Sequence, residues 1–97
     1  MTQEDIIHFL EKNKKSFFDT YKISNITLFG SYARGENRED SDIDIAIETP
    51  ISDYFLLYDF KEELEKAFHH KVDIVRLREK MNQKLKKRIL QDGVYVR

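Results

Sequence analysis

The stretch LFGSYARGENREDSDIDIAIE, residues 28–48, decides both the fold and the chemistry of this chain. An apolar strand runs into Gly30-Ser31, and after ten intervening residues a second strand opens with Asp42-Ile43-Asp44. Because side chains alternate between the two faces of a strand, we expect Asp42 and Asp44 to project to one side and Ile43 to the other. Carboxylate oxygens are ligands that Mg²⁺ prefers, so this edge of the sheet is predicted to hold a divalent cation.

The Gly30-Ser31 pair at the end of the first strand is a candidate anion site. Gly30 permits a turn, or a close approach to a ligand, that a Cβ would hinder. Ser31 is expected to cap a short helix over residues 32–34, and the free N–H groups of a helix start, together with a hydroxyl, suit a phosphate. Most Gly-Ser pairs are plain turns, so this signal gains its meaning from the two carboxylates that follow.

A third acidic residue interrupts the apolar run Val72-Asp73-Ile74-Val75. A lone carboxylate inside such a run is costly to bury unless it is paired or bound to a metal. Asp73 is therefore predicted to join Asp42 and Asp44 in one site.

Hydrophobic periodicity predicts three long helices, over about 3–20, 53–68 and 79–91, and four strands, over about 25–29, 42–48, 71–77 and 94–96. Ser52 is expected to cap the middle helix. That helix is expected to bury a broad apolar stripe of Tyr54, Phe55, Leu57, Tyr58, Leu64 and Phe68. The order of elements indicates an α/β (α+β) fold, with helices mainly on one face of a small mixed sheet. A length of 97 residues suits a single domain, 1–97, with an open site.

Composition limits where the protein works. The chain has no cysteine, which excludes disulfides and thiolate metal sites and favours a cytoplasmic location. Its acidic start, residues 2–5, is unlike a signal peptide, and no apolar run approaches the roughly 20 residues of a membrane span. We therefore expect a soluble, unprocessed protein with no membrane partner.

The net charge of −1 conceals a division along the chain. Residues 1–70 carry 8 Lys and Arg against 15 Asp and Glu, or −7, whereas residues 71–97 carry 9 against 3, or +6. Two interpretations stay open: the basic end docks an acidic partner, or it is a solvated helix face. The residues in question are Lys84, Lys86, Lys87 and Arg88.

A calcium loop is the main alternative for the acidic cluster. Asp40, Asp42 and Asp44 resemble the opening of an EF-hand, but that motif needs Gly and Glu at the positions of Ile45 and Ile51. The sequence therefore excludes an EF-hand.

The spacing of Gly30-Ser31 and Asp42-Ile43-Asp44, with Asp73 on a later strand, resembles the signature of the DNA polymerase β-like nucleotidyltransferase superfamily. The resemblance covers essentially the whole chain. Its shortness is similar to that of the minimal nucleotidyltransferase (MNT) antitoxins encoded beside HEPN-domain toxins. This resemblance implies Mg²⁺-dependent transfer of AMP from ATP to a tyrosine of a HEPN RNase toxin, which the modification silences.

The resemblance also implies roles for individual residues. Asp42 and Asp44 would bind two Mg²⁺ ions, and Asp73 would complete the shell of the ion that activates the acceptor hydroxyl. Gly30, Ser31 and Arg34 would bind the ATP phosphates. Direct nucleic-acid binding is not expected. Two other functions stay open: an antitoxin that acts by occlusion alone, and a nucleotidyltransferase for a small molecule or RNA, although such enzymes usually add a second domain for which 97 residues leave no room.

Overall fold

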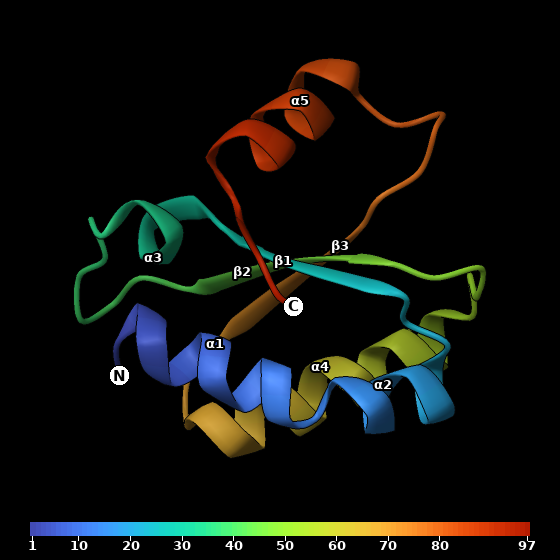
Figure 1. Ribbon diagram of the computed structural model, residues 1–97, viewed down its shortest axis with the longest axis horizontal. Helices are drawn as coiled ribbons and strands as arrows, with labels where there is room; N and C mark the ends of the chain where they lie inside the picture. Colours follow the sequence, from blue (N-terminus) through green and yellow to red (C-terminus); the bar gives the residue numbers. More distant parts are fainter.

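A computed structural model describes residues 1–97 as five helices and four strands around one sheet (Figure 1). The elements in chain order are α1 (Gln3–Lys12), α2 (Lys14–Tyr21), β1 (Asn25–Phe29), α3 (Gly30–Arg34), β2 (Ile43–Glu48), α4 (Tyr54–Phe68), β3 (Val72–Arg76), α5 (Gln83–Asp92) and β4 (Val94–Tyr95). The sheet order is β3-β2-β1-β4. β1 pairs antiparallel with both β2 and β4, whereas β2 and β3 are parallel, which confirms the predicted mixed sheet.

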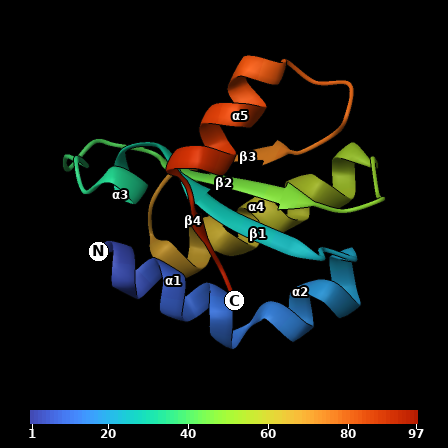
Figure 2. The same cartoon turned by 45° about the horizontal axis from the view of Figure 1, so that its top comes forward.

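One face of the sheet carries most of the hydrophobic core. α1, α2 and α4 lie together beneath the sheet in Figures 1 and 2. Ile43, Ile45 and Ile47 of β2 are fully buried against this layer, as their alternation predicts. The cluster comprises 16 buried residues, among them Phe17 of α2 and Phe60 of α4. Burial of this apolar surface is the main stabilising contribution to the fold.

The opposite face is covered mainly by α5 (Figure 2). Only Ala46, Leu77 and Ile89 form a buried cluster there. α5 leaves its basic side chains outside: Lys84, Lys87 and Arg88 are exposed, and Lys86 is half-buried. A large part of this sheet face is therefore open for a site.

The first predicted helix is in fact two helices. Asn13 ends α1, and its side-chain Nδ2 donates to the Phe9 carbonyl oxygen at 2.8 Å. Asn hydrogen-bonds the local backbone and so competes with a continuous helix. The resulting break lets α1 and α2 follow the curved underside of the sheet separately (Figure 1).

Two further helix starts were predicted wrongly. α4 is capped by Asp53, not by Ser52: the Asp53 carboxylate accepts from the backbone N–H groups of Phe55 and Leu56. α5 begins at Gln83 rather than near residue 79, because the Asn82 side chain caps it by accepting from the Leu85 N–H at 3.1 Å. In both places a short polar side chain adjacent to the expected boundary offers the better cap.

The predicted apolar stripe of α4 was also partly wrong. Leu64 and Phe68 are buried as expected, together with Phe60. Tyr54, Phe55 and Tyr58 are instead 73%, 79% and 45% exposed. Aromatic content alone does not show which helix face meets the core. No helix of the protein is long and apolar enough to cross a membrane.

Candidate active site

The sheet register places the acidic residues. Asp44 of β2 lies between Phe29 of β1 and Asp73 of the parallel strand β3. The neighbours Ile43 and Ile45 point into the helix-covered core, so Asp44 and Asp73 share the opposite face, on the side of α5. Asp42 precedes β2 by one residue and contributes a negative charge that acts on Asp44. The structure therefore brings the three predicted carboxylates to one end of the sheet.

Gly30 is required at the turn between β1 and α3 for two reasons. Its φ of +75° is a left-handed conformation that favours glycine. A Cβ at this position would lie 2.1 Å from the Oδ2 atom of Asp44. The Asp44 carboxylate thus occupies the space that a side chain would fill, which places the start of α3 directly against it.

Ser31 does not cap a helix, contrary to the sequence prediction. α3 already begins at Gly30, and its N-cap, Phe29, makes no side-chain hydrogen bond. Ser31 therefore lies in the first turn, half-buried, and its hydroxyl has no hydrogen-bond partner in the protein. The hydroxyl and the first backbone N–H groups of α3 remain free for a ligand.

Arg34 ends α3 beside the acidic cluster. Its Nε donates to Glu36 Oε2 at 3.0 Å, the one salt bridge of the protein, and its charge acts to lower the pKa of Asp44. Arg34 also lines a hollow of about 170 Å³ with Gly30 and Arg88 of α5. Two arginines therefore line the hollow next to Gly30. Sequence analysis had placed Arg88 only in the basic face of its helix.

Asp73 is exposed, so the burial argument that selected it was wrong. β3 is the outer strand of the sheet, so no further strand lies beside Asp73 on that side. Asp73 nevertheless lies directly opposite Asp44 in the register. Its place in the cluster follows from strand pairing rather than from the cost of burial.

The electrostatics of the cluster suit a cation. Partial burial, and then the charges of Asp73 and Asp42, raise the pKa of the Asp44 carboxyl, against which Arg34 acts only weakly. Carboxylates are the hard oxygen donors that Mg²⁺ takes, and three of them lie at this end of the sheet. As the side chains stand, no three His, Cys, Asp or Glu residues close into a ready-made metal site. The donor chemistry therefore fits Mg²⁺, with part of its shell left to a ligand or water.

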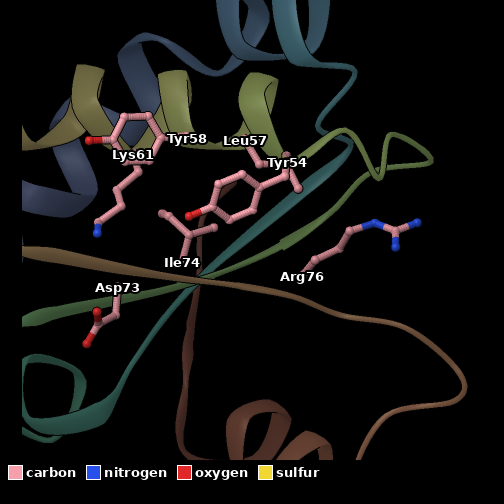
Figure 3. A pocket seen from close by; sticks show the side chains of 7 residues that line it. All are labelled: Tyr54, Leu57, Tyr58, Lys61, Asp73, Ile74 and Arg76. Atoms are coloured by element: carbon pink, nitrogen blue, oxygen red, sulfur yellow. The ribbon is translucent and has the colours of Figure 1, made fainter.

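Sequence reasoning missed a groove beside Asp73. Tyr54, Tyr58 and Lys61 of α4 line it together with Asp73 and Arg76 of β3 (Figure 3). The i, i+4, i+7 spacing on α4 was present in the sequence, but the two tyrosines were interpreted as part of one broad apolar stripe. Their exposure became visible only with the packing of α4.

The chain matches the family described as "Polymerase beta, Nucleotidyltransferase" over residues 4–97. It belongs to the polymerase β nucleotidyltransferase family. The resemblance that its signature residues predicted is thereby confirmed, as is its assignment as a nucleotidyltransferase.

Relatives and solved structures of this family agree with the assignment. The chain is 44% identical over 98 residues to "Putative protein adenylyltransferase MJ1379" of Methanocaldococcus jannaschii, with 98% of each chain covered. It is 33% identical to "Protein adenylyltransferase MntA" of Thermococcus cleftensis, over 99% of this chain and 97% of that protein. A crystal structure described as "the toxin-antitoxin with AMP-PNP" superimposes with a TM-score of 0.74 at 29% identity, over 90% of this chain and 72% of that one.

Proposed function

We propose that this nucleotidyltransferase is a Mg²⁺-dependent protein adenylyltransferase that acts as an antitoxin. It transfers AMP from ATP to a tyrosine of a cognate HEPN-domain RNase toxin and so neutralises it. The observation that carries this proposal is the register that sets Asp44 beside Asp73 and against the Gly30 turn. Its similarity to relatives named as protein adenylyltransferases, and to a toxin–antitoxin structure with AMP-PNP, supports it.

Asp42, Asp44 and Asp73 would hold Mg²⁺, as a pair of ions in the two-metal arrangement. Bound there, Mg²⁺ supplies charge stabilisation to the attacking and leaving oxygens of the transfer. Burial first, and then the charges of Asp73 and Asp42, raise the pKa of Asp44, and a bound cation would offset the repulsion among these carboxylates. Asp44 lies against the Gly30 turn, and Asp42 lies two residues before it, so both would hold the ions on the phosphate side. Asp73, on the outer strand, would serve the acceptor side.

The start of α3 would hold the phosphates of ATP. Gly30 and Ser31 offer backbone N–H groups, and Ser31 offers an unpartnered hydroxyl. Arg34 would neutralise charge on the same phosphates, with its guanidinium next to the turn. With the terminal phosphates held there, the α-phosphate would face the carboxylates, and pyrophosphate would leave on the α3 side.

Asp73 is the best-placed base for the acceptor. The tyrosine hydroxyl oxygen attacks the α-phosphorus, forming a new P–O bond, while the bond to the oxygen that bridges to the β-phosphate breaks. The hydroxyl proton passes to the Asp73 carboxylate, and pyrophosphate leaves. Because Asp73 is exposed, a partner protein reaches it without any opening motion.

The test combines mass measurement with matched variants. A cognate HEPN-domain toxin is incubated with this protein and Mg·ATP, and the intact mass of the toxin is recorded. We expect the mass to rise by whole adenylyl groups, with chelation of Mg²⁺ or the double change Asp42→Asn, Asp44→Asn abolishing the gain. Unmodified toxin that is nevertheless inhibited by wild-type protein would reject transfer in favour of occlusion.

A further inference from the structure

A groove of about 280 Å³ runs between α4 and β3 and ends at Asp73 (Figure 3). One face of α4 lines it, because residues three and four apart share a helix face. β3 contributes the other wall. The lining residues are Tyr54, Leu57, Tyr58, Lys61, Asp73, Ile74 and Arg76. The groove has room for one large side chain, less than most small-molecule sites provide.

The wall formed by β3 is an open sheet edge. Ile43 N–H donates to the Lys71 carbonyl and Leu77 N–H donates to the Ile47 carbonyl, so the odd-numbered residues of this segment pair with β2. The even-numbered residues turn their backbone groups outward. Glu65 accepts the outward N–H of Val72 at 3.0 Å. The N–H and C=O of Ile74 receive no such partner, and an open pair of this kind is a template for another strand.

The wall formed by α4 carries the most exposed aromatic surface of the protein. Tyr54 and Tyr58 are stacked, with ring centroids 6.4 Å apart, and Phe55 meets Tyr54 edge-on at 6.1 Å. The Tyr54 ring points across the groove toward Ile74 (Figure 3). Contiguous exposed aromatic side chains mark protein-binding surfaces, and they are typical of the residues that dominate binding energy.

The two ends of the groove carry positive charge. Lys61 reaches toward the Asp73 end, and Arg76 lies at the other end (Figure 3). Neither forms a salt bridge within the protein. Arg76 Nε donates to the Thr49 carbonyl at 3.0 Å, which fixes the side chain and leaves its other guanidinium nitrogens free. Both cations can receive carboxylates from a partner.

We propose that this α4–β3 groove is the docking site for the acceptor protein, which enters it as an extended segment. The segment adds to the sheet by pairing with Ile74, places an aromatic side chain against Tyr54 and Tyr58, and sets carboxylates against Lys61 and Arg76. This inference rests on the proposed function. Asp73 lines the end of the groove, but its carboxylate turns to the opposite, α5 side of β3, so docking and transfer would meet at the edge of this outer strand. Edge pairing favours a peptide over a nucleic acid, whose phosphate chain offers no matching pattern of donors and acceptors.

The first test is binding of a cognate HEPN-domain toxin to surface variants. Replacing Tyr54 and Tyr58 together with Ala should raise the Kd about 30-fold, as loss of a central aromatic anchor does. Phe18→Ala is the matched control, because Phe18 of α2 is 51% exposed and lies away from the groove. Mg·ATP affinity should be unchanged in every variant, since none touches the Gly30 turn.

Charge and edge pairing are tested separately. Lys61→Glu should weaken binding about tenfold, whereas Lys66→Glu, on the same helix but outside the groove, should not. In hydrogen exchange, the Ile74 amide should exchange rapidly in the free protein and gain at least about tenfold protection in the complex. An amide that stays unprotected in a saturated complex would overturn edge pairing.

Failure of this inference is distinguishable from failure of the proposed function. If wild-type protein modifies the toxin and the Tyr54→Ala, Tyr58→Ala variant binds and modifies it equally well, the docking site is wrong and the transfer stands. If wild-type protein binds the toxin without modifying it, and the same variant loses binding, the docking site stands and the transfer is wrong.

Discussion

The two faces of the sheet differ in composition: one carries the hydrophobic core, and the other carries the acidic residues of the candidate site. On the face covered by α1, α2 and α4, 16 buried residues form the core. On the face covered by α5, only Ala46, Leu77 and Ile89 are buried together, and Asp44 and Asp73 lie beyond them. A small domain can bury only a limited apolar surface. Because most of the apolar side chains of this protein pack on one face of the sheet, the other face is free for charged groups. Changes on the two faces should therefore separate stability from chemistry.

The largest effect is expected at Asp44 on the open face. Asp44→Asn keeps the shape beside Gly30 but removes a negative charge, so AMP transfer to the toxin should fall about 1000-fold or more. Urea unfolding should show a fold as stable as wild type. Asp40→Asn, in the exposed loop before β2, is the control and should retain transfer. Normal transfer by the Asp44 variant would remove the carboxylate cluster from the mechanism.

The next effect compares the two buried clusters directly. Phe60→Ala, in the large core, should lower the free energy of unfolding by about 4 kcal/mol, while Ile89→Ala beneath α5 should lower it by about 2 kcal/mol. The smaller cluster has fewer neighbours to lose and more freedom to relax. Chemical denaturation of both variants measures the difference. A larger loss at Ile89 would show that the α5 face contributes as much to the core as the helix layer.

A smaller effect concerns the contact between α2 and α4. Tyr21 Oη donates to Glu63 Oε1 at 2.9 Å, and Tyr21→Phe should cost about 1 kcal/mol of unfolding free energy at neutral pH. Burial, and then the Glu63 carboxylate, raise the pKa of Tyr21 from 10.0 to about 12.

The pH dependence of that contact has a definite sign. The folded protein keeps the Tyr21 proton that the unfolded chain releases above pH 10, so the contribution of Tyr21 is complete below pH 10 and is lost as the pH rises toward 12. The stability of wild-type protein should consequently fall more steeply with pH than that of Tyr21→Phe over this interval. Parallel curves would mean that Tyr21 has the same pKa in both states.

The smallest effect is expected from the basic surface of α5. Reversing Lys84, Lys86 and Lys87 to Glu should slow association with the toxin about threefold at low salt, and less at physiological salt, because surface charges mainly steer encounter. The matched control reverses Lys12, Lys15 and Lys66 on the helix-covered side. The association rates are measured by stopped flow. If they are equal in both variants, the basic residues of α5 form only a solvated helix face.

Much of the site could be predicted because its signals are local. The alternation of Asp42, Ile43 and Asp44 fixes which side chains share a face once the segment is a strand, and β2 is that strand. Gly30 follows from backbone geometry at the end of β1. Helix boundaries failed by a few residues where neighbouring polar side chains competed as caps, as at Ser52 and Asp53. Both residue types are common helix N-caps, so the sequence alone does not show which of the two will cap the helix.

The sequence by itself determined the family and the residue types of the carboxylate cluster, because strand alternation and turn chemistry depend on adjacent residues. The order of helices and strands along the chain indicated the mixed sheet. Only the tertiary structure decided that Asp73 is exposed and stands beside Asp44, since strand pairing joins residues far apart in the chain. It also decided that Tyr54 and Tyr58 face a groove and not the core. An amphipathic helix with apolar residues on several sides has no single inward face until it packs, and the packing of α4 on β3 selected Phe60 and Leu64 instead.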